Sequence, residues 1–556
     1  MPAKSKTTKK PSKSSSPRKF NKFNPGWLVA GLATITVIVG AVVINVARNN
    51  DTSSKVESTI TTDNGDLKIN WERYPTIDVE LDGSYQITTA GTYHFTGTIA
   101  DGLIAIKTTS NAPVRIILDN VTITNSAGPA IACYSADDLV VELIGDNVLT
   151  DGTKYSANYD EDVTGAIYSK SDLTFQGDGT LILTANYQDG IVAKDDLKFN
   201  SGIYQITATD DAIRGKDSVY IVAGDFTISS GADAIKSTND IDAGKGFILI
   251  ESGNFSINSG AKGIKAINSI LVYDGTFTIN STDDAIHSNN YIGLVNGNFI
   301  ITSSDDGVHA DKELIIDGGS INIAKSYEGL EAQAITINGG NLEIAASDDG
   351  INAGGGADGS ATSRPGAGAF DADTNCALTF NGGTTYVNAS GDGVDSNGYI
   401  YFNGGTVAID GPTNNGNGAL DSGAGITQTG GTVIAVGASG MAETLGQNSS
   451  TYNASIYFSS TMPAGTKIEI KNSAGITIIS HTSAKAFNHI AVGTPSFTKG
   501  ETYTVYVNDA EYTTFTVSDT TTTVGNSNMN QYNMPGQGGP GGQNTQNSQN
   551  TQPRQR

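Results

Sequence analysis

The sequence has few of the residues that build long solvated helices or disulfide frameworks. Charged residues make up only 16% of the 556 residues, against roughly 25% in an average globular protein. Helices built on Glu, Lys, Ala and Leu are therefore not expected. Cysteine occurs only twice, at Cys133 and Cys376. One pair is too few for a disulfide scaffold in a chain of this length, and we interpret both as small core residues.

Positive charge is scarce as well. The chain has 57 Asp and Glu against 33 Lys and Arg, a formal net charge of -24. This balance argues against a nucleic-acid partner, because a phosphate backbone is bound by clustered positive charge. Glycine, in contrast, is abundant at 67 residues. Ile, Val, Phe and Tyr are spaced among Gly, Asn, Asp, Ser and Thr, a pattern typical of short strands and turns.

The N-terminal segment has the pattern of a membrane anchor. Residues 1–25 carry eight basic and no acidic groups, and residues 26–47 carry no charge. A helix of this length rises about 33 Å, enough to cross a hydrocarbon core of about 30 Å. A cleaved signal peptide, the alternative, has a shorter apolar region of about 7–15 residues. We expect a single-pass transmembrane signal anchor over 26–47, with a cytoplasmic tail at 1–25 and a linker at 48–74 leading to an extracellular region.

A repeat of about 22 residues sets the fold. Each unit has three short apolar segments, such as 286, 291–294 and 299–301, separated by Gly, Asn, Asp or Ser. Three strands and three turns in one unit make one coil of a parallel β-helix, whereas a propeller blade needs about 40 residues or more. We therefore predict an all-β protein with roughly a dozen coils over residues 75–437. The repeats are anchored at Asp189, Asp211, Asp233, Lys262, Asp284, Asp306, Glu328, Asp349 and Asp392.

The C-terminal part loses this period. Alternating runs at 467–470 and 503–507 predict a small β-sandwich-like domain over 438–518 that caps the coils. Residues 519–556, rich in Gly, Gln, Asn and Pro, are expected to be disordered. A Gly-rich insertion at 354–374 predicts a surface loop.

The recurring acids are candidate calcium ligands. Equivalent positions in adjacent coils lie about 4.8 Å apart, so stacked carboxylates repel one another unless a cation offsets them. Calcium takes six to eight oxygen ligands from carboxylates, carbonyls and water. The alternative is turn chemistry, in which each Asp accepts backbone N–H bonds. The candidate Ca2+ ligands are Asp210, Asp211, Asp233, Asp283, Asp284, Asp305, Asp306, Glu328, Asp348, Asp349 and Asp392.

A second column lies three residues beyond the anchors. Its consecutive members are Arg214, Lys236, Lys265, His287 and His309, followed by Glu331, Asn352 and Asp395. The five basic or imidazole groups beside cation-bound carboxylates suit an acidic polysaccharide. The alternative is that they are solvated side chains that balance the neighbouring Asp residues. An enzyme is also conceivable, since Lys236 or Lys265 with a depressed pKa could abstract the proton alpha to a uronate carboxylate.

The coil motifs resemble a known family. The repeated DDGI or DDAI and GG-(T/N/S)-hydrophobic patterns over 186–412, with MAETLGQNSSTYNASIYFSSTMPAGTKIEI from Met441, are similar to bacterial extracellular carbohydrate-binding β-helix proteins that bind cellulose and polygalacturonate. The resemblance covers about residues 75–515. It implies a right-handed parallel β-helix, calcium at the doubled Asp positions, a shape like that of calcium-dependent pectate lyases, and binding without cleavage. Lys262 and Glu328 depart from the pattern.

Taken together, these patterns predict a cell-membrane protein whose extracellular, calcium-stabilised β-helix binds a cellulose-like or polygalacturonate-like polysaccharide. Its expected partners are that polysaccharide and, through one N-terminal helix, the membrane. Two alternatives stay open: a calcium-dependent pectate-type polysaccharide lyase acting by β-elimination, and a structural surface adhesin.

Overall fold

The structure is a computed structural model. It describes residues 69–108, 113–354 and 372–526, together with three strand backbones between residues 34 and 62. The chain divides into two compact units, Met1–Gly65 and Asp66–Arg556. The predicted tail at 1–25, most of the insertion at 354–374 and the end of the chain beyond 526 lie outside the described residues.

The described part of the first unit consists of strands. β1 (Thr34–Val39) pairs antiparallel with β2 (Val42–Ala47), which pairs antiparallel with β3 (Thr61–Thr62). A helix was expected here, but β1 consists of Thr, Ile and Val and four of the six residues of β2 are Val or Ile, and such β-branched residues favour strand backbone. In the described parts of the chain, no helix is long and apolar enough to cross a membrane. The helical span over 26–47 is thus not found where the structure describes this segment.

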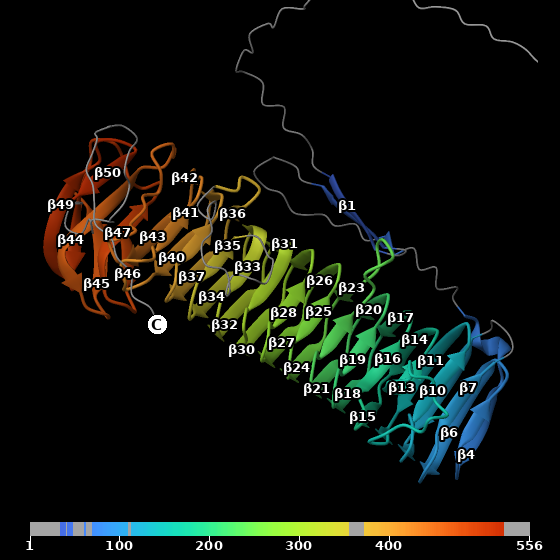
Figure 1. Ribbon diagram of the computed structural model, residues 1–556. Helices are drawn as coiled ribbons and strands as arrows, with labels where there is room; N and C mark the ends of the chain where they lie inside the picture. Colours follow the sequence, from blue (N-terminus) through green and yellow to red (C-terminus); the bar gives the residue numbers. More distant parts are fainter. Residues whose placement is uncertain are drawn as a thin grey trace, which may run out of the picture. The chain divides into compact units, whose positions relative to one another are not determined.

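The second unit is a right-handed parallel β-helix of about 14 coils, which confirms the solenoid predicted from the repeat period. The coils stack along one axis from β4 to β43 (Figure 1). The predicted number of coils, roughly a dozen, is slightly low because the first coils have the least regular repeats. A single 3-10 turn, η1 (Trp71–Arg73), precedes the coils.

Each coil adds one strand to each of three parallel ladders. Ladder 1 contains β5 (Tyr85–Ile87), β7 (Ile104–Lys107), β10 (Ile131–Ser135), β13 (Gly165–Ser169), β16 (Asp189–Ala193), β19 (Ile213–Gly215), β22 (Ile235–Ser237), β25 (Ile264–Ala266), β28 (Ile286–Ser288), β31 (Val308–Ile316), β33 (Leu330–Ile337), β35 (Ile351–Ala353), β38 (Val394–Ser396) and β41 (Leu420–Ser422). Ladder 2 contains β4 (Thr76–Leu81), β6 (Gly91–Ile99), β8 (Val114–Asp119), β11 (Asp138–Ile144), β14 (Asp172–Gly177), β17 (Asp196–Phe199), β20 (Ser218–Ile221), β23 (Phe247–Ile250), β26 (Ser269–Val272), β29 (Tyr291–Leu294), the second halves of β31 and β33, β36 (Ala377–Phe380), β39 (Tyr399–Phe402) and β42 (Gly425–Gln428). Ladder 3 contains the end of β6, β9 (Thr122–Thr124), β12 (Asp146–Thr150), β15 (Thr180–Ala185), β18 (Ile203–Ala208), β21 (Asp225–Ser230), β24 (Asn254–Ser259), β27 (Thr276–Ser281), β30 (Asn298–Ser303), β32 (Ser320–Ser326), β34 (Asn341–Ala346), β37 (Thr384–Ala389), β40 (Thr406–Asp410) and β43 (Thr432–Gly437).

The core is a set of stacked columns inside the three ladders. In ladder 3, alternate residues point inward, and the rings of Phe226, Phe255, Phe277 and Phe299 stack with centroid distances of 5.0, 4.6 and 4.6 Å. These rings are almost fully buried. Offset stacking and apolar burial therefore add up coil by coil, as expected where each coil buries the face of its neighbour.

Glycine with a positive φ lies in the turn before every ladder 3 strand except β9, where Asn120 has a φ of 56° instead. Gly275, for example, has a φ of 136°. A Cβ at this position would lie 2.9 Å from the carbonyl oxygen of Gly253 in the previous coil and 2.9 Å from the Phe277 ring. An L-residue here would be strained and would clash with the backbone of the preceding coil. Much of the glycine content of the chain is explained by this column.

Side chains on the outer edge form an amide ladder. Asn338 Nδ2 donates to Asp317 Oδ1 at 2.7 Å, Asn381 Nδ2 donates to Asn338 Oδ1 at 2.8 Å, and Asn403 Nδ2 donates to Asn381 Oδ1 at 3.0 Å. Each amide is both donor and acceptor, so identical residues can stack at coil spacing without a mismatch.

The C-terminal strands close the end of the stack. β47 (Phe487–Gly493) pairs antiparallel with β43 and with β44 (Asn453–Met462). A second, four-stranded antiparallel sheet has the order β46 (Thr477–Thr482), β45 (Lys467–Asn472), β48 (Thr502–Val507) and β49 (Ala510–Thr516). The segment expected to be disordered from residue 519 contains one more strand, β50 (Thr521–Val524), which pairs with β44. Its Thr-Thr-Thr-Val sequence favours a strand.

Both cysteines are buried and unpaired. Cys133 lies inside ladder 1, and Cys376 directly precedes β36. Their interpretation as small core residues is confirmed.

Candidate functional site

An acid column lines the turns between ladder 3 and ladder 1. Its members are the anchors Asp189, Asp211, Asp233, Lys262, Asp284, Asp306, Glu328, Asp349 and Asp392. Most of them are buried, and carboxylates accept the backbone N–H of the next anchor: Asp211 N donates to Asp189 Oδ1 at 3.3 Å, Asp233 N to Asp211 Oδ1 at 3.1 Å, Lys262 N to Asp233 Oδ1 at 3.0 Å, Asp306 N to Asp284 Oδ1 at 3.2 Å, and Glu328 N to Asp306 Oδ1 at 3.1 Å. These acids therefore have a structural role in joining coils, whatever else they bind.

A second column runs beside the acid column on ladder 1. We call it the outer column, and strand register makes its members direct neighbours: Tyr168, Val192, Arg214, Lys236, Lys265, His287, His309, Glu331, Asn352, Asp395 and Asp421. The column changes from apolar through basic and imidazole to acidic along the stack. All five predicted ligand-binding residues lie in its central part.

The three permanent cations of the outer column are paired within the molecule. Each is about one-quarter exposed, and each contacts a buried anchor carboxylate. The ion pairs are Arg214 with Asp189, Lys236 with Asp211 at 3.1 Å and Asp233 at 2.8 Å, and Lys265 with Asp233 at 3.9 Å. This is the charge-balancing alternative raised by the sequence. A role of these residues in glycan binding stays a prediction.

The environment of Lys236 disfavours a role as catalytic base. Burial alone would lower the pKa of its ammonium, but the hydrogen bond to Asp233 and the charge of Asp211 raise that pKa above its usual value. A lysine that abstracts a proton needs a depressed pKa. The two neighbouring carboxylates therefore keep Lys236 protonated.

Lys262 shows why one anchor is not acidic. Its Nζ lies 2.6 Å from Asp284 Oδ2 and 2.8 Å from Asp283 Oδ1 in the next coil, and its side chain is 8% exposed. The residue departs from the family pattern, yet it keeps the backbone bond to Asp233 and adds a positive charge where two acids meet. Lys262 thus offsets the repulsion that the sequence predicted calcium would offset.

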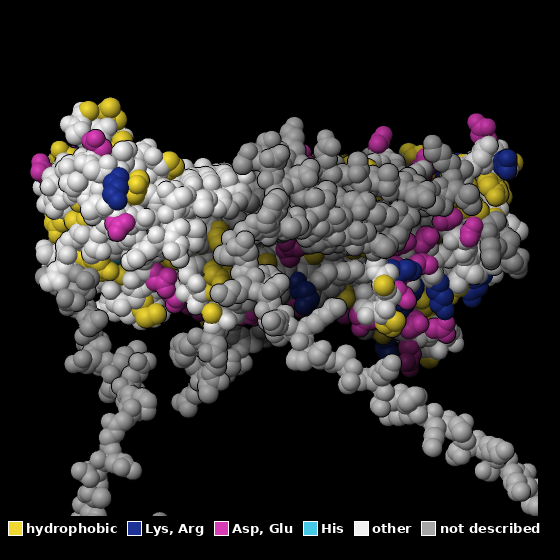
Figure 2. Space-filling model, turned by 90° about the horizontal axis from the view of Figure 1, so that it is seen from above, with side chains coloured by type: hydrophobic (Ala, Val, Ile, Leu, Met, Phe, Trp, Pro, Cys, Tyr) yellow, Lys and Arg dark blue, Asp and Glu magenta, His cyan; other side chains and the backbone are white. Residues whose placement is uncertain are grey.

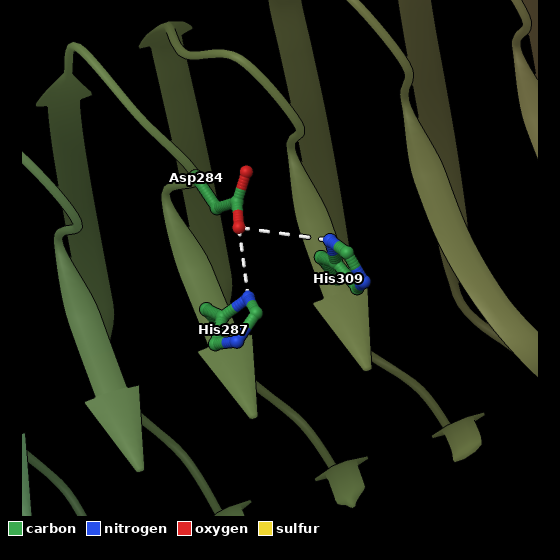
Figure 3. Close-up of side chains that lie close together, drawn as sticks. All are labelled: Asp284, His287 and His309. Atoms are coloured by element: carbon green, nitrogen blue, oxygen red, sulfur yellow. Dashed lines mark hydrogen bonds and ion pairs between the residues drawn. The ribbon is translucent and has the colours of Figure 1, made fainter. Parts of the chain in front are cut away.

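Two histidines continue the neutralisation beyond Lys262. His287 Nδ1 lies 2.8 Å from Asp284 Oδ2, and His309 Nδ1 lies 3.6 Å from the same oxygen (Figure 3). Burial alone would raise the pKa of the Asp284 carboxyl, but the bond to His287 and the charge of Lys262 hold that pKa well below its usual range. Asp284 is therefore ionised and paired.

His309 is surrounded by acids. Its Nδ1 lies 3.3 Å from Asp306 Oδ2 and 3.4 Å from Glu331 Oε2. Burial alone would lower the pKa of this imidazole, but the nearby carboxylates, Asp306 first, raise that pKa to about 9. Burial and the charges of Glu331 and Asp306 raise the pKa of Glu328 to about 9. This part of the column has more acids than cations.

The last coils have no such balance. A carboxylate cluster consists of Asp349, Asp392, Asp395, Asp421 and Glu443. Burial and mutual repulsion raise the pKa of Asp349 to about 7, and burial is the main cause that raises the pKa of Asp392 to about 6 and of Glu443 to about 7. None of the five takes part in an ion pair with another described residue. Their charge is left to be compensated by protons or by a cation.

Three further acid groups bring carboxylate oxygens within 4.8 Å of one another. They are Asp189 with Asp210 and Asp211, Asp283 with Asp284 and Asp305, and Asp172 with Asp195 and Asp196. The first joins the predicted ligands Asp210 and Asp211 to Asp189, which was predicted only as an anchor, and the second unites three predicted ligands from adjacent coils. The third was missed because its residues lie outside the anchor motif. Asp395 and Asp421 were also missed as ligands, although the repeat period places both in the outer column, whereas Glu443 follows the last coil and no periodic signal marks it.

Charges of both signs are mixed on the surface. On the face seen in Figure 2, Asp and Glu side chains lie among Lys and Arg side chains toward the N-terminal coils. The net charge of -24 therefore does not correspond to a uniformly acidic surface.

A shallow groove runs along a different set of turns. This turn groove lies between ladder 2 and ladder 3 and has a volume of about 900 Å³. It follows Gly202, Gly224, Gly253, Gly275, Gly297 and Gly319 over six consecutive coils. At a strand spacing of about 4.8 Å these coils span about 24 Å. Its other lining residues are mostly polar, and three of them are acidic, namely Asp178, Asp225 and Asp274.

Comparison with known proteins agrees with this architecture. Residues 81–350 match the model of a family described as "Carbohydrate-binding domain-containing protein". The β-helix of this chain is similar to that family. The resemblance predicted from the coil motifs is thereby confirmed over just under half of the chain.

Two relatives are similar over part of the chain. A "Carbohydrate-binding domain-containing protein" of Acetivibrio thermocellus is 36% identical over 127 residues, 22% of this chain, which spans 44% of the relative's length. The solved structure of the polysaccharide lyase-like protein from C. thermocellum, a gadolinium derivative, is 29% identical to this chain. The match covers 96% of that structure and 43% of this chain. Its TM-score of 0.36 is too low to support an inference.

The buried Lys262 pair makes a testable contribution to stability. We expect Lys262→Met to lower the free energy of unfolding by about 3 kcal/mol or more, because it leaves the Asp284 charge buried with one partner fewer. Urea unfolding followed by circular dichroism measures the change. The matched control is Lys170→Met, which removes an exposed pair with Asp160 at 3.6 Å and should cost at most about 1 kcal/mol. Equal effects of the two variants would contradict the role of Lys262.

Proposed function

We propose that the β-helix binds an extracellular polysaccharide along the turn groove. The match of residues 81–350 to a carbohydrate-binding family supports the ligand class. The observation that carries the placement is the groove itself, which is open, polar and repeated coil by coil over six coils. A regular row of backbone and short polar side chains is suited to a polymer whose sugar units repeat along its axis.

The lining of the groove favours a neutral, cellulose-like chain. Asp178, Asp225 and Asp274 lie in it, and its lining residues include no Lys, Arg or His. A polygalacturonate-like chain would meet like charge there and would need bridging calcium to bind. A neutral polymer can instead donate its hydroxyl groups to the carboxylates and to the Asn and Ser oxygens without a cation.

Filling the groove should weaken polysaccharide binding. Thr276 is the first residue of β27 and lines the groove, so Thr276→Trp places a large ring in the path of the ligand. We expect the affinity for soluble cello-oligosaccharides to fall about tenfold or more, a loss of roughly 1.4 kcal/mol. Isothermal titration calorimetry in the presence of EGTA measures it.

The control lies two residues along the same strand. Thr278 is also exposed but does not line the groove, so Thr278→Trp should bind like the unchanged protein. Equal affinities of the two variants, or binding of polygalacturonate alone, would rule out the groove as a neutral-glycan site. Formation of an unsaturated, ultraviolet-absorbing product from polygalacturonate would favour the lyase alternative instead.

The carboxylate cluster is proposed as the calcium site. Four of its acids lie in the last coils and Glu443 follows them, and the outer column there has no cation among the described residues to balance them. A calcium ion prefers oxygen ligands and tolerates a flexible geometry, so it fits a set made only of carboxylates and nearby carbonyls. By its charge this cluster is better suited to a cation than the central anchors are, because those are paired with Arg214, Lys236 and Lys262.

Chelation should therefore destabilise the protein. We expect the thermal midpoint to fall when calcium is replaced by EGTA, because an ion bound only to the folded state stabilises it. Asp395→Asn should reduce this calcium-dependent shift. Asp233→Asn, in the neutralised part of the stack, should lower the midpoint but keep the shift. An unchanged midpoint on chelation would exclude a structural calcium ion.

The membrane anchor is proposed from the sequence alone. The uncharged run at 26–47 and the eight basic groups before it would hold the extracellular β-helix at the cell membrane. In cell fractionation, the protein should stay with the membranes after an alkaline carbonate wash. Its release by the wash would show a peripheral or secreted protein.

A further inference from the structure

The strongest unexplained feature outside the groove is His309. Its side chain is 1% exposed, and neither ring nitrogen makes a hydrogen bond. Three carboxylate oxygens nevertheless lie 3.3 to 3.6 Å from Nδ1, from Asp306, Glu331 and Asp284. A buried polar group without a hydrogen bond costs free energy and calls for a ligand or water that satisfies it. The ring is therefore placed as if a further atom belonged between it and the carboxylates.

A second orphaned group lies two coils beyond His309. Asn352 is the register neighbour of Glu331, and its Oδ1 is buried without a hydrogen-bond partner. Its Nδ2 donates to Glu328 Oε2 at 3.0 Å, which fixes the orientation of the amide. Buried polar atoms without hydrogen bonds thus lie in the coils on both sides of Glu331.

We propose that His309, Asp306 and Glu331 bind a divalent transition-metal ion of the zinc class. Their ligand atoms lie within 4.8 Å of one another and are all buried. A tetrahedral ion with bonds of about 2.1 Å requires ligands about 3.4 Å apart. The observed separations from His309 Nδ1 are 3.3 Å to Asp306 and 3.4 Å to Glu331. The ligands therefore need little movement to close around an ion.

His309 could instead share an ion with His287 and Asp284, but the charge around Asp284 argues against it. Lys262 Nζ lies 2.6 Å from Asp284 Oδ2, and His287 already bonds to the same oxygen. A second cation there would be repelled by the ammonium. On the other side of His309, Asp306 and Glu331 pair only with this one imidazole among the ion pairs of the described residues. The excess negative charge places the ion beside Glu331.

The donor set selects the class of metal. Imidazole nitrogen is a good ligand for zinc and its neighbours, whereas calcium and magnesium are bound by oxygen. Asp306 and His309 come from one coil and Glu331 from the next. A bound ion would cross-link two adjacent coils of the stack.

Metal titration of the full chain tests this site. We expect the EDTA-treated protein to take up about one Zn2+ per chain in excess Ca2+, with a rise of the thermal midpoint. One equivalent of Co2+ should give the visible absorption of a low-symmetry nitrogen- and oxygen-ligated ion. His309→Asn and Glu331→Gln should each weaken Zn2+ binding by more than the 10- to ~100-fold that loss of an outer-sphere bond costs.

His287→Asn is the matched control. It changes the neighbouring buried imidazole, and it should leave Zn2+ binding within about threefold of the unchanged protein. Circular dichroism of each metal-free variant establishes that it is folded. Equal loss of binding in His287→Asn would move the ion to Asp284 and overturn the assignment. Displacement of Zn2+ by millimolar Ca2+, or no binding above the level of Glu331→Gln, would show that only water or protons satisfy His309. Polysaccharide binding is measured separately, so either proposal can fail alone.

Discussion

The structure depends on one constraint, which is that every side chain in a parallel β-helix stands about 4.8 Å from its equivalent in the next coil. This spacing suits flat rings and amides. Phe226, Phe255, Phe277 and Phe299 stack with ring planes within 5° of parallel, and the amides of Asn338, Asn381 and Asn403 bond in series. The same spacing is unfavourable for like charges, which repel one another at this distance. The way in which the negative charge of the recurring acids is compensated therefore decides where a cation can bind.

The charge of the acids is compensated in different ways along the stack. In the central coils, Arg214, Lys236 and Lys262 contact Oδ2 of buried anchor carboxylates, and Oδ1 of the same carboxylates accepts a backbone N–H. Beyond them the outer column changes to imidazole at His287 and His309, and then to carboxylate and amide. Along the stack, the acid column and the outer column continue with acids beyond their last Lys, Arg or His residue. A surplus of negative charge is thus concentrated in the later coils, and it is there that both proposed ion sites lie.

The groove and the acid column lie on different turns, so that one set of turns forms the groove and the other joins the coils. The turns between ladder 3 and ladder 1 join coils through buried charge and hydrogen bonds. The turns between ladder 2 and ladder 3 are shaped by glycine, because a Cβ at Gly275 would meet the carbonyl oxygen of the coil before. Backbone is consequently exposed along the groove, and the lining consists of short polar groups. This arrangement leaves the groove free to contact a polymer. The side chains of the acid column, in contrast, form ion pairs and hydrogen bonds within the fold.

The sequence by itself determined the solenoid, the coil boundaries near 75–437, the acid and outer columns and the resemblance to a carbohydrate-binding family. Each of these depends on a repeat of about 22 residues that can be read directly from the sequence. Tertiary structure decided what those columns do. The reach of Lys262 into the next coil, the missing hydrogen bonds of His309 and the placement of Glu443 near Asp421 depend on side-chain direction and on neighbours supplied by folding. The turn groove could not be predicted either, since it is a shape made by six coils together and no single repeat contains it.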